Sequence, residues 1–197
     1  SIIMPAYRRV LQGNFRLEDT GLRFAVPVSS HQEEGTILKA TTGKAITVYF
    51  IRADKYFDRD YIYGTHEGNY PDNAERFTFF SRAALEVLKL YPHHILHAND
   101  WQSALCIAFL KAQPYLYPQL SQVKTVFTVH NLGFQGLFPA QDWHLLNLDG
   151  SFFTPRYLEF YGQSNFLKGG LVFADAITTV SPGYAEEIKT SEQGFGL

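Results

Sequence analysis

Two short segments of this chain gather side chains of several chemical types between apolar runs. The first contains His97, Asn99, Asp100 and Trp101, and so places an imidazole, an amide, a carboxylate and an indole within five residues. Together these groups can hold a polar ligand at a turn between a strand and a helix. The alternative is structural, because Asn99 or Asp100 at such a turn is also a typical helix cap, whose side chain accepts backbone amide hydrogen bonds.

The second segment puts His130 and Asn131 at the end of an apolar run and continues with Gly133, Gln135 and Gly136. Glycines in such a loop let a ligand approach the backbone closely. A tight turn that needs positive φ at both glycines is the alternative. That alternative accounts for the glycines but leaves the histidine, the asparagine and the glutamine unexplained, so this segment is the sharper candidate for a site.

Two other groups of residues invite functional interpretations that their context does not favour. Four possible metal ligands are close in sequence, namely His93, His94, His97 and Asp100. A strand-to-loop path scatters their side chains and no matching ligand pair stands elsewhere, so we expect no metal site. Lys168, Gly169 and Gly170 fall inside a helical pattern, whereas a phosphate loop must directly follow a strand. We expect these small residues to permit close helix packing instead.

Short apolar runs alternate with helical patterns over most of the chain. Strands are expected at 2–4, 95–96, 123–129 and 176–180, and helices at 72–91, 102–112, 162–173 and after Ser181-Pro182. This alternation is typical of an α/β fold with a parallel sheet and helices on both faces. In such folds the loops after the carboxyl ends of the strands carry the chemistry, and both polar segments fall there.

One region departs from this pattern. Residues 22–28 and 45–51 alternate apolar and polar side chains, which is typical of strands with one exposed face. Residues 29–44 between them are polar and punctuated by glycine, which favours a connection. We therefore expect a β-hairpin insertion near 22–51, with 29–44 joining its two strands.

Composition excludes several classes of partner. The 197 residues carry a formal net charge of −2, so nothing basic is present to neutralise a nucleic acid backbone. Apolar runs are far shorter than the ~20 residues of a membrane helix, and no signal peptide is visible. The single cysteine, Cys106, lies in an apolar run and is expected to be buried, in a protein of a reducing compartment. The chain starts with a strand-like segment and no initiator methionine, which predicts truncation.

Five segments in a fixed order make the chain resemble the ADP-glucose-dependent glycogen and starch synthases of bacteria and plastids. They are Tyr70-Pro71-Asp72-Asn73, His97-Ala98-Asn99-Asp100-Trp101, Thr128-Val129-His130-Asn131-Leu132-Gly133-Phe134-Gln135-Gly136, Phe166-Leu167-Lys168-Gly169-Gly170-Leu171 and Thr178-Thr179-Val180-Ser181-Pro182-Gly183-Tyr184-Ala185. The resemblance covers essentially the whole chain. Several motifs in the right order make it specific, where any one of them would be weak.

The resemblance implies a retaining glucosyltransferase that moves glucose from ADP-glucose to the non-reducing end of an α-1,4-glucan. It implies two Rossmann-like domains with the active site in the cleft between them, no cofactor and no metal. It also implies a location in the bacterial cytoplasm or the plastid stroma. Such a reaction needs positive charge to stabilise the leaving diphosphate and polar groups around the developing oxocarbenium ion.

The same resemblance implies roles for individual residues. His130 is expected to contact the donor glucose and Asp100 to lie near the reacting sugars, so these two form the expected catalytic set. Tyr70 corresponds to a tyrosine on the acceptor side. The other residues expected to bind or shape the substrate are Asn73, Trp101, Asn131, Gln135 and Gly136.

Two parts of the family pattern are not found in the sequence. A Lys-x-Gly-Gly-Leu loop that meets the diphosphate and sugar would precede Ser1, and a C-terminal nucleotide-binding domain with basic residues would follow Leu197. Residues 1–197 are therefore expected to be a partial N-terminal catalytic domain that lacks its first strand and glycine loop and is inactive alone. The alternatives are another nucleotide-sugar glycosyltransferase and a non-catalytic glucan-binding module.

Overall fold

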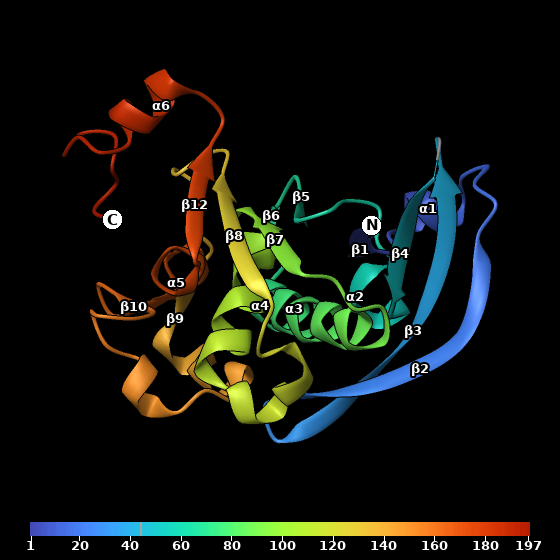
Figure 1. Cartoon of the computed structure of the whole chain (residues 1–197). Helices are drawn as coiled ribbons and strands as arrows, with labels where there is room; N and C mark the ends of the chain where they lie inside the picture. The colour runs from blue at the N-terminus through green and yellow to red at the C-terminus, as the bar shows by residue number, and fades with distance from the viewer. Residues whose placement is uncertain (44) are drawn as a thin grey trace.

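The computed structural model describes residues 1–43 and 45–197; Lys44, at the end of the predicted hairpin connection, lies outside the described residues. The two largest sheets lie on either side of helices α3 (Asn73–Leu90) and α4 (Asp100–Ala112) (Figure 1). α3 packs against the first of these sheets and against α4, and α4 packs against the second. The main hydrophobic core therefore runs from the first sheet through both helices to the second.

The first sheet has the strand order β1-β4-β3-β2. β1 (Ile2–Pro5) runs parallel to β4 (Ile46–Arg52), and β3 (His31–Thr42) pairs antiparallel with both β4 and β2 (Glu18–Val28). The predicted hairpin near 22–51 is therefore wrong in one respect, because most of its expected connection is itself a strand. The polar, largely exposed start of β3 and Gly35 within it interrupt the alternation from which a strand is recognised.

The second sheet consists of three parallel strands in the order β12-β8-β7. They are β7 (Ile95–Asn99), β8 (Lys124–Val129) and β12 (Ala176–Thr179). The predicted parallel strands and covering helices are thus confirmed. The predicted single sheet with helices on both faces is not found, because the described strands of the α/β part divide between two sheets. One face of β7 and β8 packs on α4, while Ile95 and His97 on the other face are exposed.

Helix boundaries follow local capping. α3, α4 and α6 (Pro182–Glu187) lie where helices were predicted, and the Ser181 hydroxyl accepts a hydrogen bond from the Tyr184 N–H at 3.1 Å as the N-cap of α6. α5 (Phe166–Phe173) begins four residues later than predicted, because the Asn165 side chain caps it there. A Cβ added to Gly170 would lie 2.6 Å from the ring of Phe127, so this glycine permits close packing as expected.

Short elements complete the fold. They are α1 (Arg8–Leu11), α2 (Asp54–Phe57), the 3-10 helices η1 (Pro114–Leu116), η2 (Pro118–Leu120), η3 (Ala140–Leu146) and η4 (Gly150–Phe152), and the strands β5 (Gly64–Thr65), β6 (Gly68–Asn69), β9 (Leu137–Pro139), β10 (Glu159–Phe160) and β11 (Gln163–Asn165). Cys106 is buried in α4 as expected, and burial raises the pKa of its thiol to about 12. Among the described helices, none has the length and apolar character needed to span a membrane.

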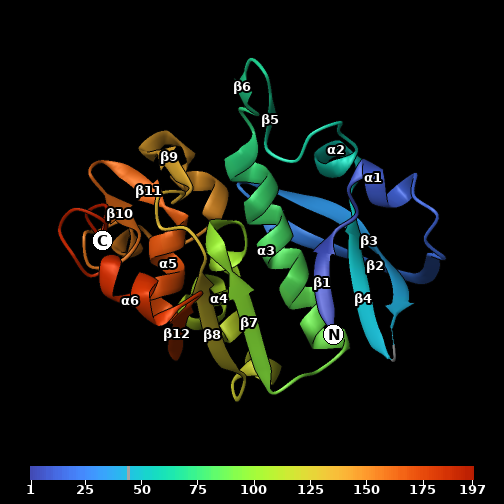
Figure 2. The same cartoon turned by 90° about the horizontal axis from the view of Figure 1, so that it is seen from above.

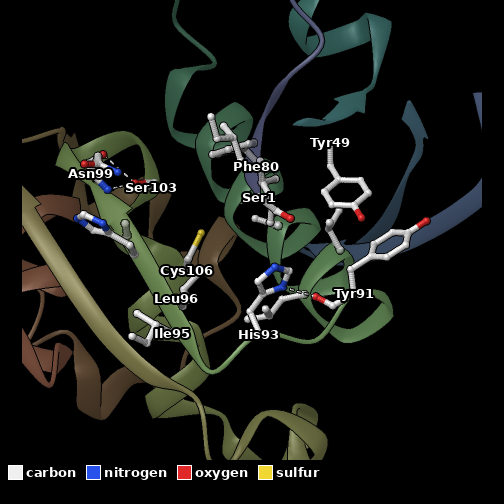
Figure 3. A pocket seen from close by; sticks show the side chains of 17 residues that line it. Ser1, Tyr49, Phe80, Tyr91, His93, Ile95, Leu96, Asn99, Ser103 and Cys106 are labelled. Atoms are coloured by element: carbon white, nitrogen blue, oxygen red, sulfur yellow. Dashed lines mark hydrogen bonds between the residues drawn. The ribbon is translucent and has the colours of Figure 1, made fainter. Parts of the chain in front are cut away.

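A gap separates the two sheets where their edge strands β1 and β7 face each other on either side of α3 (Figure 2). A cavity of about 310 Å³ lies there, with walls from both strands and from α3. In Figure 3 the stacked rings of Tyr49 and Tyr91 lie on one side of the cavity, and Ile95, Leu96 and Cys106 lie on the other. In the described structure, β1 and β7 therefore each keep one backbone edge without a strand partner.

Candidate active site

The two polar segments meet at the carboxyl ends of β7 and β8, beside a cavity of about 670 Å³. Parallel strands explain the convergence, because their carboxyl ends lie at the same edge of a sheet. Seven of the eight residues predicted for the site line this one cavity: Tyr70, Asn73, Asp100, Trp101, Asn131, Gln135 and Gly136. The eighth, His130, is joined to the cavity wall through Asp100.

Asp100 and His130 form a closely coupled pair. One carboxylate oxygen of Asp100 accepts a hydrogen bond from the backbone N–H of His130 at 2.7 Å, and the other lies 2.9 Å from His130 Nδ1. Because a carboxylate only accepts hydrogen bonds, this contact favours the tautomer of a neutral imidazole that carries its proton on Nδ1. Nε2 is then the free acceptor, on a side chain that is 49% exposed. The pair therefore presents an oriented imidazole to a ligand.

The backbone of Asp100 is in the left-handed region, with φ of 54°. Residues other than glycine rarely adopt this conformation, which costs about 1–2 kcal/mol and concentrates at functional sites. The turn from β7 into α4 holds the carboxylate toward His130. The helix-cap alternative is wrong for both candidates, since Asn99 makes no side-chain cap bond and the Asp100 carboxylate bonds to His130. Instead the Ser103 hydroxyl bonds the backbone of Asn99 at 2.7 Å.

The loop after His130 turns tightly in front of Trp101. The Asn131 side chain accepts a hydrogen bond from the Gly133 N–H at 2.9 Å and so shapes the turn. Gly136 has φ of 64°, and a Cβ there would lie 2.6 Å from the Trp101 ring, so glycine is required. The alternative of a tight turn with positive φ at both glycines holds at Gly136 only. It is wrong at Gly133, where the Asn131 side chain shapes the turn and φ is not positive.

This loop is held in place by residues that the sequence analysis did not identify. The buried amide oxygen of Gln135 accepts from Asn165 Nδ2 at 2.6 Å, and its amide nitrogen donates to the Phe195 carbonyl at 3.3 Å. The Tyr184 hydroxyl accepts from the Leu132 N–H at 2.8 Å. Both the amide oxygen and the amide nitrogen of Gln135 are therefore engaged in hydrogen bonds within the protein. The sequence analysis did not predict these contacts of Asn165 and Tyr184, although Tyr184 belongs to the Ser-Pro-Gly-Tyr part of the resemblance.

The opposite wall of the cavity comes from the segment before α3. Asn73 is buried, and its amide nitrogen donates to the Tyr63 carbonyl at 2.8 Å while its amide oxygen accepts from Arg76 Nη1 at 2.6 Å. The ring of Tyr70 lies 4.7 Å from the guanidinium carbon of Arg59 and 5.1 Å from that of Arg76. Asn73 thus holds the wall, and the Tyr70 ring packs near two guanidinium groups.

Aromatic rings form the floor of the cavity. The Trp101 ring centroid lies 4.8 Å from that of Phe77, 5.8 Å from that of Phe138 and 6.0 Å from that of Tyr63. Phe134 at the mouth is 68% exposed. In the described lining the charged residues are Asp100 and Asp142, with no lysine or arginine. Aromatic surfaces with amide and carboxylate acceptors suit a neutral polyhydroxyl ligand better than an anion.

A possible metal-binding group lies outside this site. His31, Glu33 and Glu75 each place one ligand atom within 4.8 Å of the others. The ammonium group of Lys55 already lies between the two carboxylates, 2.5 Å from Glu33 and 3.0 Å from Glu75. A cation is therefore supplied by the protein itself, and the group is best described as a salt-bridge cluster. His93 belongs to the sequence cluster at which no metal site was expected. Its ring Nδ1 lies 2.7 Å from the Tyr91 carbonyl oxygen.

A parallel sheet with the Asp100–His130 pair and an aromatic-lined cavity at its carboxyl edge describes an α/β domain with a candidate ligand site. The family description "Starch synthase catalytic domain" matches residues 1–197. The chain therefore belongs to this family of glycosyltransferase domains of glycogen and starch synthesis.

Known relatives agree with this assignment. The chain is 44% identical over 198 residues to a glycogen synthase of Syntrophotalea carbinolica, covering 100% of the chain and 41% of that protein. It is 45% identical over 201 residues to a glycogen synthase of Koribacter versatilis, covering 100% of the chain and 40% of that protein. The chain thus spans about two fifths of the length of these relatives.

A solved structure is similar as well. It is the catalytic domain of starch synthase IV from Arabidopsis thaliana bound to ADP and acarbose, with a TM-score of 0.87 and 29% identity. The match covers 100% of this chain and 41% of that one.

Proposed function

We propose that residues 1–197 are part of a retaining glucosyltransferase that moves glucose from ADP-glucose to the non-reducing end of an α-1,4-glucan. The Asp100–His130 pair at the rim of an aromatic cavity carries the proposal, because it offers an oriented imidazole and a carboxylate beside a surface suited to sugars. The glycogen synthase relatives, and the ADP and acarbose bound by the plant relative, support the choice of substrates.

His130 and Asp100 act on the donor sugar in this proposal. With its proton on Nδ1, the imidazole accepts a hydrogen bond from a glucose hydroxyl at Nε2 and orients the ring. The Asp100 carboxylate places negative charge near the developing oxocarbenium ion, which stabilises the transition state more than the ground state. Asn131 and Gly136 keep the loop in the shape that brings His130 to the sugar, and Gln135 fastens it.

The acceptor glucan lies against the other wall in this proposal. Tyr70 offers a ring face and a hydroxyl, and Trp101 an indole face, on which sugar rings stack. Asn73 contributes by holding the wall, because both of its amide groups are engaged within the protein. No metal or cofactor takes part.

The cationic groups that stabilise the leaving diphosphate come from elsewhere in this proposal, because no lysine or arginine lines the described cavity. We infer that the catalytic unit needs chain outside residues 1–197: a first strand with its glycine loop, and a second, nucleotide-binding domain. The open edges of β1 and β7 and the 41% coverage of the relatives support this inference. The bacterial cytoplasm and the plastid stroma are the proposed locations.

The test is glucose transfer by the complete gene product that carries this segment. Radiolabelled ADP-glucose and glycogen should yield labelled α-1,4-linked chains with retention at the anomeric carbon, and activity should persist in EDTA. The 197-residue chain alone should show no turnover above background. Failure of the complete product to use ADP-glucose, with turnover of a different nucleotide sugar, would favour another glycosyltransferase. Glucan binding without transfer from any donor would favour the non-catalytic binding module.

A further inference from the structure

A guanidinium group is buried directly behind the wall of the candidate active site. Arg76 lies in the first turns of α3 and is fully buried. Its Nε donates to the Tyr56 carbonyl at 2.8 Å, and its Nη1 donates to the Ile62 carbonyl at 3.0 Å and to the Asn73 amide oxygen at 2.6 Å. One side chain therefore joins the helix to two points of the preceding segment and to a residue that lines the cavity.

The burial of this charge is unusual because, among residues 1–43 and 45–197, Arg76 has no carboxylate partner. Desolvation lowers the pKa of Arg76, and the nearby Arg59 lowers it further. Removing a cation from water costs several kcal/mol unless the geometry of its partners is favourable. Three neutral oxygens and the rings of Tyr70, Phe77 and Phe57, 5.1, 5.4 and 5.7 Å away, offset part of that cost, and the Asp72 charge adds to this offset. Nη2 is buried without a hydrogen-bond partner among the described residues. A fold that needed only hydrophobic packing here would be served better by an apolar side chain.

The guanidinium fixes the positions of three residues that line the cavity, Asn73, Tyr63 and Tyr70. Asn73, held by Arg76, donates to the Tyr63 carbonyl at 2.8 Å, and the ring of Tyr63 stands next to Trp101. The ring of Tyr70 packs over Arg76 itself. Tyr63, Tyr70 and Trp101 all line the cavity. Displacing Arg76 therefore moves the wall without removing any group that touches the ligand.

We propose that Arg76 is a positioning residue that sets the shape of the glucan-binding wall through Asn73, Tyr63 and Tyr70. The proposal rests on the proposed function, because it assigns that wall to the acceptor. Lysine cannot replace Arg76, because one ammonium group cannot reach the carbonyls of Tyr56 and Ile62 and the Asn73 amide in the fork geometry that a guanidinium provides.

The same helix offers a matched control. Arg82 lies six residues further along α3 and is also fully buried. It donates to the Leu146 carbonyl at 2.6 Å, to the Gln113 amide oxygen at 3.1 Å and to the Tyr117 hydroxyl at 3.3 Å. None of these three partners lines the candidate cavity. Arg82→Lys therefore reproduces the loss of a buried guanidinium without touching the wall.

The first experiment compares Arg76→Lys and Arg82→Lys in the complete gene product. We expect both to lower the melting temperature. We expect only Arg76→Lys to raise the KM for maltoheptaose, by about tenfold, with kcat and the KM for ADP-glucose changed by less than about twofold. Equal effects of the two variants on the maltoheptaose KM, or no effect of Arg76→Lys, would overturn the proposal.

A second readout is independent of activity. In the complete gene product with Trp143 and every tryptophan outside residues 1–197 replaced by phenylalanine, the remaining tryptophan is Trp101. Arg76→Lys should increase acrylamide quenching of its fluorescence by about twofold, and Arg82→Lys should leave it unchanged. Unchanged quenching in Arg76→Lys would overturn the positioning role of Arg76. This readout does not need activity, so the positioning role and the proposed glucosyltransferase function can fail separately.

If Arg76→Lys does not fold, Asn73→Asp provides a second test of the link from Arg76 to Tyr63. The carboxylate gives Arg76 a charged acceptor and stabilises the pair, but it cannot donate to the Tyr63 carbonyl. We expect a folded protein with the same increase in Trp101 quenching. Quenching equal to that of the wild type would show that the link from Arg76 to Tyr63 does not set the wall.

Discussion

His130 and Asp100 lie 30 residues apart in the chain, yet one carboxylate meets both the backbone N–H and the ring Nδ1 of the histidine, at 2.7 and 2.9 Å. The two contacts have different consequences. The backbone hydrogen bond fixes where the loop leaves β8, and the ring contact favours a proton on Nδ1. A single side chain thus sets the position and favours one tautomer of the imidazole proposed to contact the donor sugar.

Loss of the imidazole should impair chemistry rather than folding. In the complete gene product, His130→Ala is expected to lower kcat by about 10²-fold, because its contact to the sugar strengthens in the transition state. Circular dichroism and the melting temperature should stay unchanged. His144→Ala, at another exposed histidine, is the control and should keep full activity. Wild-type turnover in His130→Ala would leave the histidine a structural role only.

The carboxylate can be tested separately from the backbone strain. Asp100→Asn keeps the size of the side chain, and asparagine tolerates the left-handed backbone about as well as aspartate. The amide can still accept from the His130 N–H, but its NH₂ group then faces Nδ1 and favours the other tautomer. We expect kcat to fall by about 10–10²-fold, with an unfolding free energy within about 1 kcal/mol of the wild type. Equal losses of activity and stability would contradict this assignment.

The aromatic wall should separate the two substrates. Tyr70→Ala removes a ring that lines the cavity on the side of Arg59 and Arg76, away from His130. We expect the KM for glucan to rise more than the KM for ADP-glucose, measured in the complete product at saturating concentrations of the other substrate. The opposite order would put Tyr70 on the donor side.

Gly136 should be intolerant of any side chain. Gly136→Ala combines φ of 64° with a Cβ only 2.6 Å from Trp101. We expect the unfolding free energy to fall by about 1–3 kcal/mol. Gly150→Ala is the control, because its φ is not positive and no atom lies within 4 Å of an added Cβ. Urea denaturation of both variants decides the matter, and equal midpoints would show that the loop relaxes at little cost.

The sequence was informative where chemistry and local pattern coincide. His130 and Asp100 stand at ends of apolar runs, so their convergence follows from the parallel sheet. Tyr184 and Asn165 escaped notice because their partners, Leu132 and Gln135, lie 52 and 30 residues away. No local signal encodes those pairings.

Arg76 escaped notice for a different reason. An arginine within a helical pattern is normally taken as solvent-exposed, and only the packing of residues 56–73 against α3 buries it. The strand β3 was missed because its polar residues face outward in a sheet whose partners on both sides are set by tertiary structure.

The last prediction concerns the gap between β1 and β7. Both strands present an unpaired backbone edge to a cavity of about 310 Å³ that is lined by apolar side chains of α3 such as Phe80 and Leu88. Parallel strands are normally buried on both sides, and open edges recruit further strands. If the family's first strand belongs there, the 197-residue chain should fill the gap from another copy.

We therefore expect the isolated chain to be oligomeric or poorly soluble in size-exclusion chromatography. Ile95→Lys, at an exposed position of β7 that lines the gap, should reduce self-association, because a charge on an edge strand opposes pairing. Ile62→Lys, exposed but outside the gap, should not. A monodisperse wild-type monomer with a cooperative melt above ~45 °C, the low end for mesophilic domains, would contradict the prediction. The two sheets would then be stable as they stand, with water satisfying the open edges and with α3 and α4 joining them.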